Sequence, residues 1–345
     1  MSIASAITSL QSRVADAYTS VGNKGGTLPA TQDTLHLPAA IASIPAGSST
    51  KWGMSIEGVC YTDNNGVAKL FGGVSGALTF TGVTDISAYG MTYSFYKNNG
   101  ITTVSFPSLT GISGSWGGHG LEYAFYQSSV TSVSFPELLT VGDSGFGNNG
   151  SHFANAFQNC TSLTTASFPK LTGIYGTGAF TSAFRGCTSL TSVSFPELTG
   201  ASTSSFASAF VGCTLLTSVS FTKLATIDGT STFSGAFGAG TSTSPASGVT
   251  TLAFPALTAI ISNAAAAGAI FRYNKTLTRI DFPVLSSMKK TANATTDNLT
   301  YIFNDCTNLT ELHFGSANQS VIEASDGYAT KWGAPNANCT IYFDL

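Results

Sequence analysis

Charged residues are scarce in this sequence. Asp, Glu, Lys and Arg make up 9% of its 345 residues, whereas about 25% is usual for soluble proteins. The 14 basic and 17 acidic side chains give a net charge of −3, and no basic stripe is present that could displace counterions from phosphates. We therefore expect no binding to nucleic acid. Gly, Ser, Thr and Ala replace the missing charges, which predicts a hydroxyl-rich surface that is unusual for a cytosolic enzyme.

Long apolar stretches are also lacking. No segment is long and apolar enough to span a bilayer, so we expect no membrane insertion. Residues 1–18 are amphipathic, but they lack a basic region followed by an unbroken apolar one. We therefore expect no signal peptide.

Patterns typical of catalytic, metal or cofactor sites are missing as well. The segment Gly142-Asp-Ser-Gly145 is similar to the nucleophile motif of serine proteases, but it falls in a variable loop of a repeat and is explained by the abundance of Gly and Ser. No glycine-rich phosphate loop is present, and the histidines do not stand at metal-ligand spacing from cysteines or carboxylates. We expect no catalytic residue, no metal and no cofactor. The histidines are His36, His119, His152 and His313.

The sequence does contain an internal repeat, which is marked by a recurring phenylalanine. Its spacing ranges from 26 residues, between Phe195 and Phe221, to 33 residues, between Phe135 and Phe168. Phe80 is similar to a degenerate first copy. The eight clear copies are Phe106, Phe135, Phe168, Phe195, Phe221, Phe254, Phe282 and Phe314.

A second phenylalanine precedes most of these markers by 10 or 11 residues, as Phe184 precedes Phe195. In one pair, Phe237 and Phe254, the gap is six residues longer. Insertions otherwise fall after the marker, in segments such as 111–120. Indels that are tolerated on only one side of the unit are typical of a solenoid.

Each repeat is predicted to contain one strand, for example Leu190–Phe195. Val193 and Phe195 would point inward, and Ser192 and Ser194 outward, because side chains alternate along a strand. The preceding Ala-Phe-x-x-Cys segment predicts a short helical or 3₁₀ turn. The sequence thus predicts an α/β repeat solenoid that is leucine-rich-repeat-like, with a parallel β-sheet on one face and about eight or nine coils.

Four of the six cysteines occupy one fixed place in the repeat. Free cysteine is among the most buried residue types, so this placement favours a ladder of buried thiols over disulfides. These cysteines are Cys160, Cys187, Cys213 and Cys306.

The chain ends are predicted to form separate modules. Residues 1–46 predict a helical anchor, residues 51–74 a β-hairpin that caps the solenoid of residues 75–320, and residues 321–345 a second cap with a strand at its end. The helices could pack on themselves as a hairpin, or they could oligomerise or dock to a partner. The apolar residues of this anchor are Ile3, Ile7, Leu10, Val14, Tyr18, Val21, Ile41 and Ile44.

Two clusters of side chains are candidates for binding a ligand or partner. The first is aromatic and comprises Tyr96, Trp116, His119 and Tyr126; it would form a stacking platform if exposed and would fill the first coils if buried. The second replaces the outward Ser and Thr in the last two coils. It pairs Arg279 with Glu311 and Asp281 with His313, either as cross-strand charge pairs or as a recognition patch.

The repeat closely resembles the BspA-type leucine-rich repeats of bacterial surface proteins and phage structural proteins. This resemblance covers about residues 75–315 and is carried by the pattern Ala-Phe-x-x-Cys-Thr-Ser-Leu-Thr-Ser-Val-x-Phe-Pro. The ends of the chain are similar to those of tailed-phage virion proteins, in segments 24–32 and 37–44 at one end and 327–335 and 339–345 at the other.

The resemblance implies a non-enzymatic virion protein, such as a fibre, decoration or host-attachment subunit. Such a subunit would reside in the virion, form a homo-oligomer or contact other virion proteins through its N-terminal helices, and bind a host surface glycan or protein. One alternative is a bacterial cell-surface adhesin. Another is a glycan-acting enzyme, which would need two carboxylates about 5–9.5 Å apart; Asp281 and Glu311 are the obvious neighbours.

Overall fold

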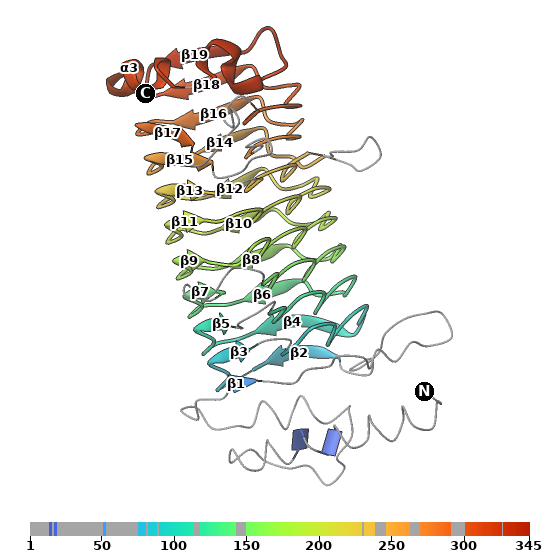
Figure 1. Ribbon diagram of the computed structural model, residues 1–345. Coiled ribbons are helices and arrows are strands. Elements are labelled where there is room, and N and C mark those ends of the chain that lie inside the picture. Colours follow the sequence, from blue (N-terminus) through green and yellow to red (C-terminus); the bar gives the residue numbers. More distant parts are fainter. Residues whose placement is uncertain are drawn as a thin grey trace, which may run out of the picture.

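The computed structural model describes residues 14–15, 17–18, 51–52, 75–80, 82–87, 90–113, 118–142, 150–229, 231–238, 246–262, 270–290, 301–325 and 327–345. Its coils stack along one axis from the first strands to the C-terminal end (Figure 1). The predicted solenoid with parallel sheet is confirmed. The structure also adds a second sheet, because each coil contributes two strands rather than one.

The nine-stranded sheet lies on one side of the coils and contains the odd-numbered strands from β1 to β17 in sequence order. Every pairing in it is parallel. Its strands are β1 (Lys51–Trp52), β3 (Asp85–Ser87), β5 (Gly111–Ser113), β7 (Thr140–Val141), β9 (Gly173–Ile174), β11 (Gly200–Ala201), β13 (Thr226–Asp228), β15 (Ala259–Ser262) and β17 (Ser287–Lys290).

The second side carries the strands that the repeat predicts. A six-stranded parallel sheet contains β2 (Gly76–Thr79), β4 (Ile101–Ser105), β6 (Ser132–Ser134), β8 (Thr165–Ser167), β10 (Ser192–Ser194) and β12 (Ser218–Ser220). A four-stranded sheet continues this side of the solenoid, since its first strand, β14, lies next to β12, the last strand of the six-stranded sheet. Its strands are β14 (Thr251–Ala253), β16 (Arg279–Phe282), β18 (Glu311–Phe314) and β19 (Thr340–Phe343).

The third side, which we call the turn ladder, replaces the predicted helical or 3₁₀ turn. In its first described coil the amide of Ser94 donates to the carbonyl of Met91, three residues earlier, at 3.1 Å. The next amide, of Phe95, donates instead to Ala124 of the following coil at 2.8 Å. Left-handed residues such as Tyr93, with φ 57°, produce this alternation. A helix would bond only within itself, whereas this ribbon also bonds coil to coil.

Phenylalanine side chains fill the interior in three ladders. The first ladder contains the repeat markers from Phe80 to Phe314 and ends at Phe343, with neighbouring ring centroids 4.5–5.9 Å apart. The second contains Phe95, Phe125, Phe157, Phe184, Phe210 and Phe237. The third contains Phe153, Phe180, Phe206, Phe233, Phe271 and Phe303.

The third ladder corrects one sequence pairing. Phe271, which the spacing predicts to follow Phe237, stacks on Phe233 instead, with centroids 5.5 Å apart. Asn274 follows Phe237 and accepts a hydrogen bond from its amide at 2.9 Å. The long gap after Phe237 thus accompanies a shift of the turn ladder by one turn.

The predicted ladder of buried thiols is confirmed. Cys160, Cys187, Cys213 and Cys306 are free and buried. Each donates to the carbonyl of a phenylalanine in the preceding coil at 2.9–3.0 Å. Burial is the main cause that raises the pKa of Cys160, Cys213 and Cys306 to about 12. These thiols therefore serve the fold.

Part of the threonine content also serves the fold. Before the strands of the six-stranded sheet, the hydroxyl of Thr131 donates to the carbonyl of Thr102 at 2.8 Å, that of Thr164 to Thr131 at 3.0 Å, and that of Thr191 to Thr164 at 3.2 Å. These bonds tie each coil to its neighbour, and they leave the outward positions of the strands themselves for other uses.

The C-terminal segment covers the last coil. Strand β19 pairs with β18 in parallel, after η1 (Ser316–Asn318), α3 (Gln319–Glu323) and η2 (Tyr328–Gly333). Trp332 is fully buried, and its ring centroid lies 6.3 Å from that of Phe303 and 5.7 Å from that of Phe314. The segment 327–335 thus has a folding role of its own.

Of the predicted anchor, the structure describes four helical residues: Val14, Ala15, Ala17 and Tyr18. Tyr18 and Ala17 are buried in the hydrophobic core, and Val14 packs against it. The other apolar residues of the anchor lie outside the described residues; these are Ile3, Ile7, Leu10, Val21, Ile41 and Ile44. Nearly all of the predicted hairpin 51–74 also lies outside them. Its first two residues, Lys51 and Trp52, form β1, which pairs with β3.

Candidate binding surfaces

The outward positions of the six-stranded sheet form two rows of hydroxyls, which we call the hydroxyl face. In register, Ser192 of β10 lies between Thr165 and Ser218, and Ser194 lies between Ser167 and Ser220. Of these six side chains only Ser194 is half-buried, and the others are exposed. Because neighbouring strands are about 4.8 Å apart, the hydroxyls repeat at a nearly constant interval. The face is flat, polar and uncharged.

The aromatic cluster is a quartet of tyrosines on the turn ladder. Tyr96 and Tyr126 stack with centroids 4.8 Å apart and planes 4° apart, and Tyr93 and Tyr123 stack at 4.8 Å and 6°. All four rings are partly exposed. Because the rings stack from coil to coil, the faces between them are already covered. This geometry favours contact through ring edges and phenolic hydroxyls over the platform predicted for Tyr96 and Tyr126.

Trp116 and His119 were also predicted to belong to the aromatic cluster. Trp116 lies outside the described residues. His119 precedes Tyr123 and Tyr126 in the same coil, and its Nδ1 lies 2.6 Å from Oε2 of Glu122. Burial raises the pKa of the Glu122 carboxyl, and the attraction of His119 opposes that rise. His119 is thus engaged with its own coil.

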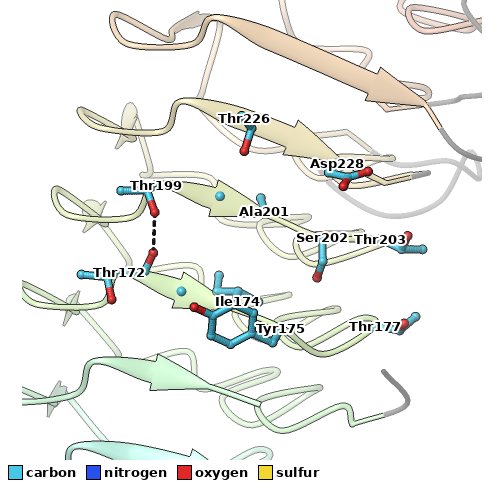
Figure 2. Close-up of a pocket in the computed structure, with 12 residues that line it drawn as sticks. Thr172, Ile174, Tyr175, Thr177, Thr199, Ala201, Ser202, Thr203, Thr226 and Asp228 are labelled. Atoms are coloured by element: carbon cyan, nitrogen blue, oxygen red, sulfur yellow. Dashed lines mark hydrogen bonds between the residues drawn. The ribbon is translucent and has the colours of Figure 1, made fainter. Parts of the chain in front are cut away.

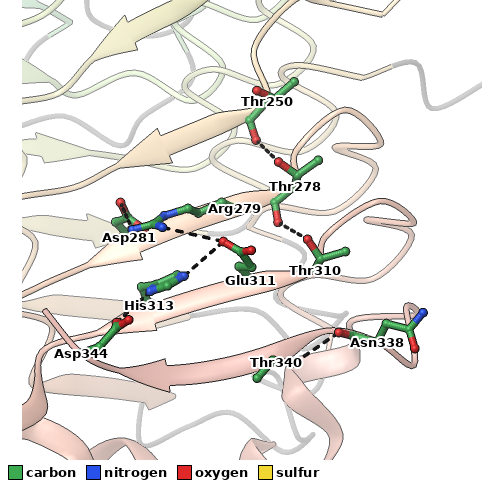
Figure 3. A network of polar contacts seen from close by, with 10 residues as sticks. All are labelled: Thr250, Thr278, Arg279, Asp281, Thr310, Glu311, His313, Asn338, Thr340 and Asp344. Carbon is green, nitrogen blue, oxygen red and sulfur yellow. Dashed lines mark hydrogen bonds and ion pairs between the residues drawn. The ribbon is translucent and has the colours of Figure 1, made fainter.

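The second predicted cluster is a chain of polar contacts at the C-terminal end (Figure 3). Arg279 and Glu311 are in register on β16 and β18, with Nη1 and Oε2 3.7 Å apart. Asp281 shares the register of His313, but it bonds Arg279 at 2.6 Å. His313 instead contacts Glu311 at 3.3 Å and Asp344 at 2.8 Å.

This network connects the last coils. His313 is nearly buried, with its side chain 7% exposed, and it stacks on Tyr342 of β19 with centroids 4.5 Å apart. Asp281 and Glu311 both contact Arg279. Carboxylates held by one guanidinium are typical of a structural ion pair and are not poised as a hydrolytic acid and base.

We expect Glu311→Gln to lower the free energy of unfolding by less than about 1 kcal/mol, because a partly exposed ion pair contributes little. Glu311 is 41% exposed. Urea unfolding followed by circular dichroism measures the change. A loss of several kcal/mol would contradict the weak contribution assigned to this pair.

Within the described ranges, no group of three or more His, Cys, Asp or Glu side chains could hold a metal ion. Among the residues placed by the structure, no helix is long and apolar enough to cross a membrane.

Residues 83–182 and 119–247 match the family model for the BspA type leucine rich repeat region, which is matched in six copies. This similarity covers slightly less than half of the chain. The chain is also similar to two solved structures. A leucine rich repeat protein of T. pallidum is 18% identical, over 46% of this chain and 75% of that one, with a TM-score of 0.28.

A leucine rich cell surface protein of Faecalibacterium prausnitzii A2-165 is 14% identical, over 78% of this chain and 87% of that one, with a TM-score of 0.30. No curated protein matches the chain.

Proposed function

We propose that this chain is a non-enzymatic binding protein of the adhesin type, which presents the hydroxyl face to a partner surface. The observation that carries this proposal is the regular double row of Ser and Thr on β8, β10 and β12, in which all side chains are exposed except the half-buried Ser194. Hydroxyls both donate and accept hydrogen bonds, so such rows suit a flat, polar and repetitive partner such as a surface glycan.

The architecture supports this role. Stacked rings, together with thiols and hydroxyls that bond neighbouring coils, hold each coil against the next, so the face is rigid before it binds and loses little entropy on binding. BspA-type repeats over residues 83–247 are consistent with a bacterial surface protein. The absence of an open carboxylate pair at Asp281 and Glu311 favours binding over hydrolysis.

The face can be tested with Ser167→Glu, Ser194→Lys and Ser220→Glu combined in one protein. Alternating charges keep the cross-strand neighbours attractive, so the fold is preserved while the hydroxyl row is lost. We expect retention on mucin-coated or peptidoglycan-coated beads to fall at least about tenfold, equivalent to ~1.4 kcal/mol of binding free energy.

The matched control carries Thr161→Glu, Thr188→Lys and Thr214→Glu. These threonines are exposed, occupy one repeat position of successive coils and lie before the same three strands. We expect the control to be retained like the wild type. Equal retention of both variants would show that the hydroxyl face is not the binding surface.

A virion location, with homo-oligomers or other virion proteins as partners, stays a prediction from the end segments. The burial of Trp332 supplies a folding reason for one of those segments, which does not depend on where the protein resides. Mass spectrometry of purified phage particles decides this point, because a virion subunit must be present in them.

A further inference from the structure

We infer that a groove on the nine-stranded sheet is a second binding site, which takes a neutral saccharide ring. The groove is lined by residues of β9, β11 and β13 and of the segments on either side of these strands, and it has a volume of about 330 Å³ (Figure 2). This is within the range of small-molecule sites, about 300–1,000 Å³. It lies on a different sheet from the hydroxyl face, so it goes beyond the function proposed above.

Two glycines on neighbouring strands create the floor of the groove. Gly173 and Gly200 are in register, whereas the same outward position holds Thr140 on one side and Thr226 on the other. A Cβ at Gly173 would lie 2.6 Å from ring atoms of Tyr175. The glycine therefore lets that ring lie directly on the backbone.

Tyr175 supplies an aromatic surface inside the groove. Its side chain is 37% exposed, and Figure 2 shows the ring spread across the strand. In the next coil, Ser202 occupies the position of Tyr175. An exposed ring of this kind matches the apolar C–H face of a sugar at low entropic cost.

Polar groups surround this ring. Asp228, which lies two coils after Tyr175, is exposed, and Ser202 and Thr226 are half-buried. The hydroxyls of Thr172 and Thr199 donate to backbone carbonyls of the preceding coil, at 3.1 and 3.0 Å. Those donations leave their lone pairs as acceptors for a ligand.

The charge of the groove decides between ligand classes. Asp228 is the one charged residue among the described residues that line it, and no Lys, Arg or His is among them. A phosphate or a carboxylate would find a carboxylate and no cation. A neutral polyol would find an aromatic surface, hydroxyl acceptors and one carboxylate that accepts hydrogen bonds from sugar hydroxyls.

The test is saturation-transfer NMR of the full chain with three soluble probes: chitotriose, cellotriose and galactose. We expect saturation transfer to at least one of them. We expect Tyr175→Ala to weaken its binding at least about tenfold by removing the aromatic surface.

Gly200→Thr provides a blocking variant that should fold. A Cβ at Gly200 meets only Oγ1 of Thr226, at an ordinary 3.5 Å, and the substitution introduces the residue that β13 carries at this position. It should fill the groove and abolish the signal. The matched control is Ala259→Thr, at the same outward position of β15 but outside the groove, and it should bind like the wild type.

The inference is overturned if none of the three probes receives saturation from the wild type, or if Gly200→Thr keeps the full signal. The two proposals also separate cleanly. The triple hydroxyl-face variant should keep the saccharide signal and lose bead retention, whereas Gly200→Thr should do the reverse.

Discussion

Phe195→Ala is expected to lower the free energy of unfolding by about 3–5 kcal/mol, which is typical of a large buried ring replaced by alanine. Phe195 is fully buried at the middle of the first ladder. Its ring centroid lies 5.1 Å from that of Phe168 and 5.6 Å from that of Phe221. It also meets Phe180 and Phe206 of the third ladder nearly edge-on. Urea unfolding measures the loss.

Leu215→Ala is the matched control in a neighbouring coil. Leu215 is 57% exposed, so its removal should change the free energy of unfolding by no more than about 0.5 kcal/mol. Because solenoid stability is a sum over neighbouring coils, the central ring couples two interfaces at once. A loss below about 1 kcal/mol for Phe195→Ala would show that the ladders do not hold the coils together.

Alkaline pH is expected to destabilise the protein steeply. The thiols of Cys160, Cys213 and Cys306 have their pKa raised from 9.0 to about 12, and burial also raises the pKa of Cys187 well above 9.0. Their stabilising contribution is full below pH 9.0 and is lost as pH rises toward 12, because only the unfolded chain then releases these protons. Each thiol should contribute a slope of about 1.4 kcal/mol per pH unit.

A variant that combines Cys160→Ala with Cys213→Ala isolates this effect from tyrosine and lysine titration. The slope of unfolding free energy against pH should become shallower by about 2.7 kcal/mol per pH unit between pH 9.5 and 11. Urea unfolding at a series of pH values gives both slopes. Identical slopes would mean that these thiols ionise while the protein is folded.

The repeat was predictable because its marker residues occupy the same buried position in every coil. Phe195 and its counterparts must be apolar to fill the core, and Cys187 and its counterparts must be small and buried. The register of Arg279 with Glu311 followed from the same phase. Positions that repeat in sequence repeat in space, which fixes strand pairing without knowledge of the rest of the coil.

The remaining features depend on backbone geometry that single residues do not reveal. Strands such as Gly200–Ala201 are too short and too small to show an alternating pattern, so the nine-stranded sheet was not predicted. The turn ladder needs left-handed residues, yet it takes them from Tyr93, Lys97 and Asn155 as well as from glycine. The Phe-x-x-x-Phe spacing of Phe153 with Phe157 was a visible signal of the third ladder.

The groove escaped sequence analysis because its parts are individually ordinary. Gly173, Gly200 and Tyr175 have no shared motif, and they meet only because parallel pairing puts the two glycines side by side. Likewise, the stacking that covers the faces of Tyr96 and Tyr126 depends on the spacing between coils. Neither the groove nor this stacking can be predicted from residue types or from their spacing in the sequence.

The central claim, that the hydroxyl face contacts the partner, is tested most directly by labelling a single introduced cysteine. The five described cysteines are buried, so Ser194→Cys reports on the face once Cys60→Ser removes the sixth. Maleimide labelling is measured with the protein free and bound to mucin-coated or peptidoglycan-coated beads. Binding through this face predicts labelling at least about tenfold slower on the beads, and unchanged labelling for Gln158→Cys on the turn ladder. Unchanged labelling at Ser194→Cys, with protection of Gln158→Cys instead, would contradict the claim.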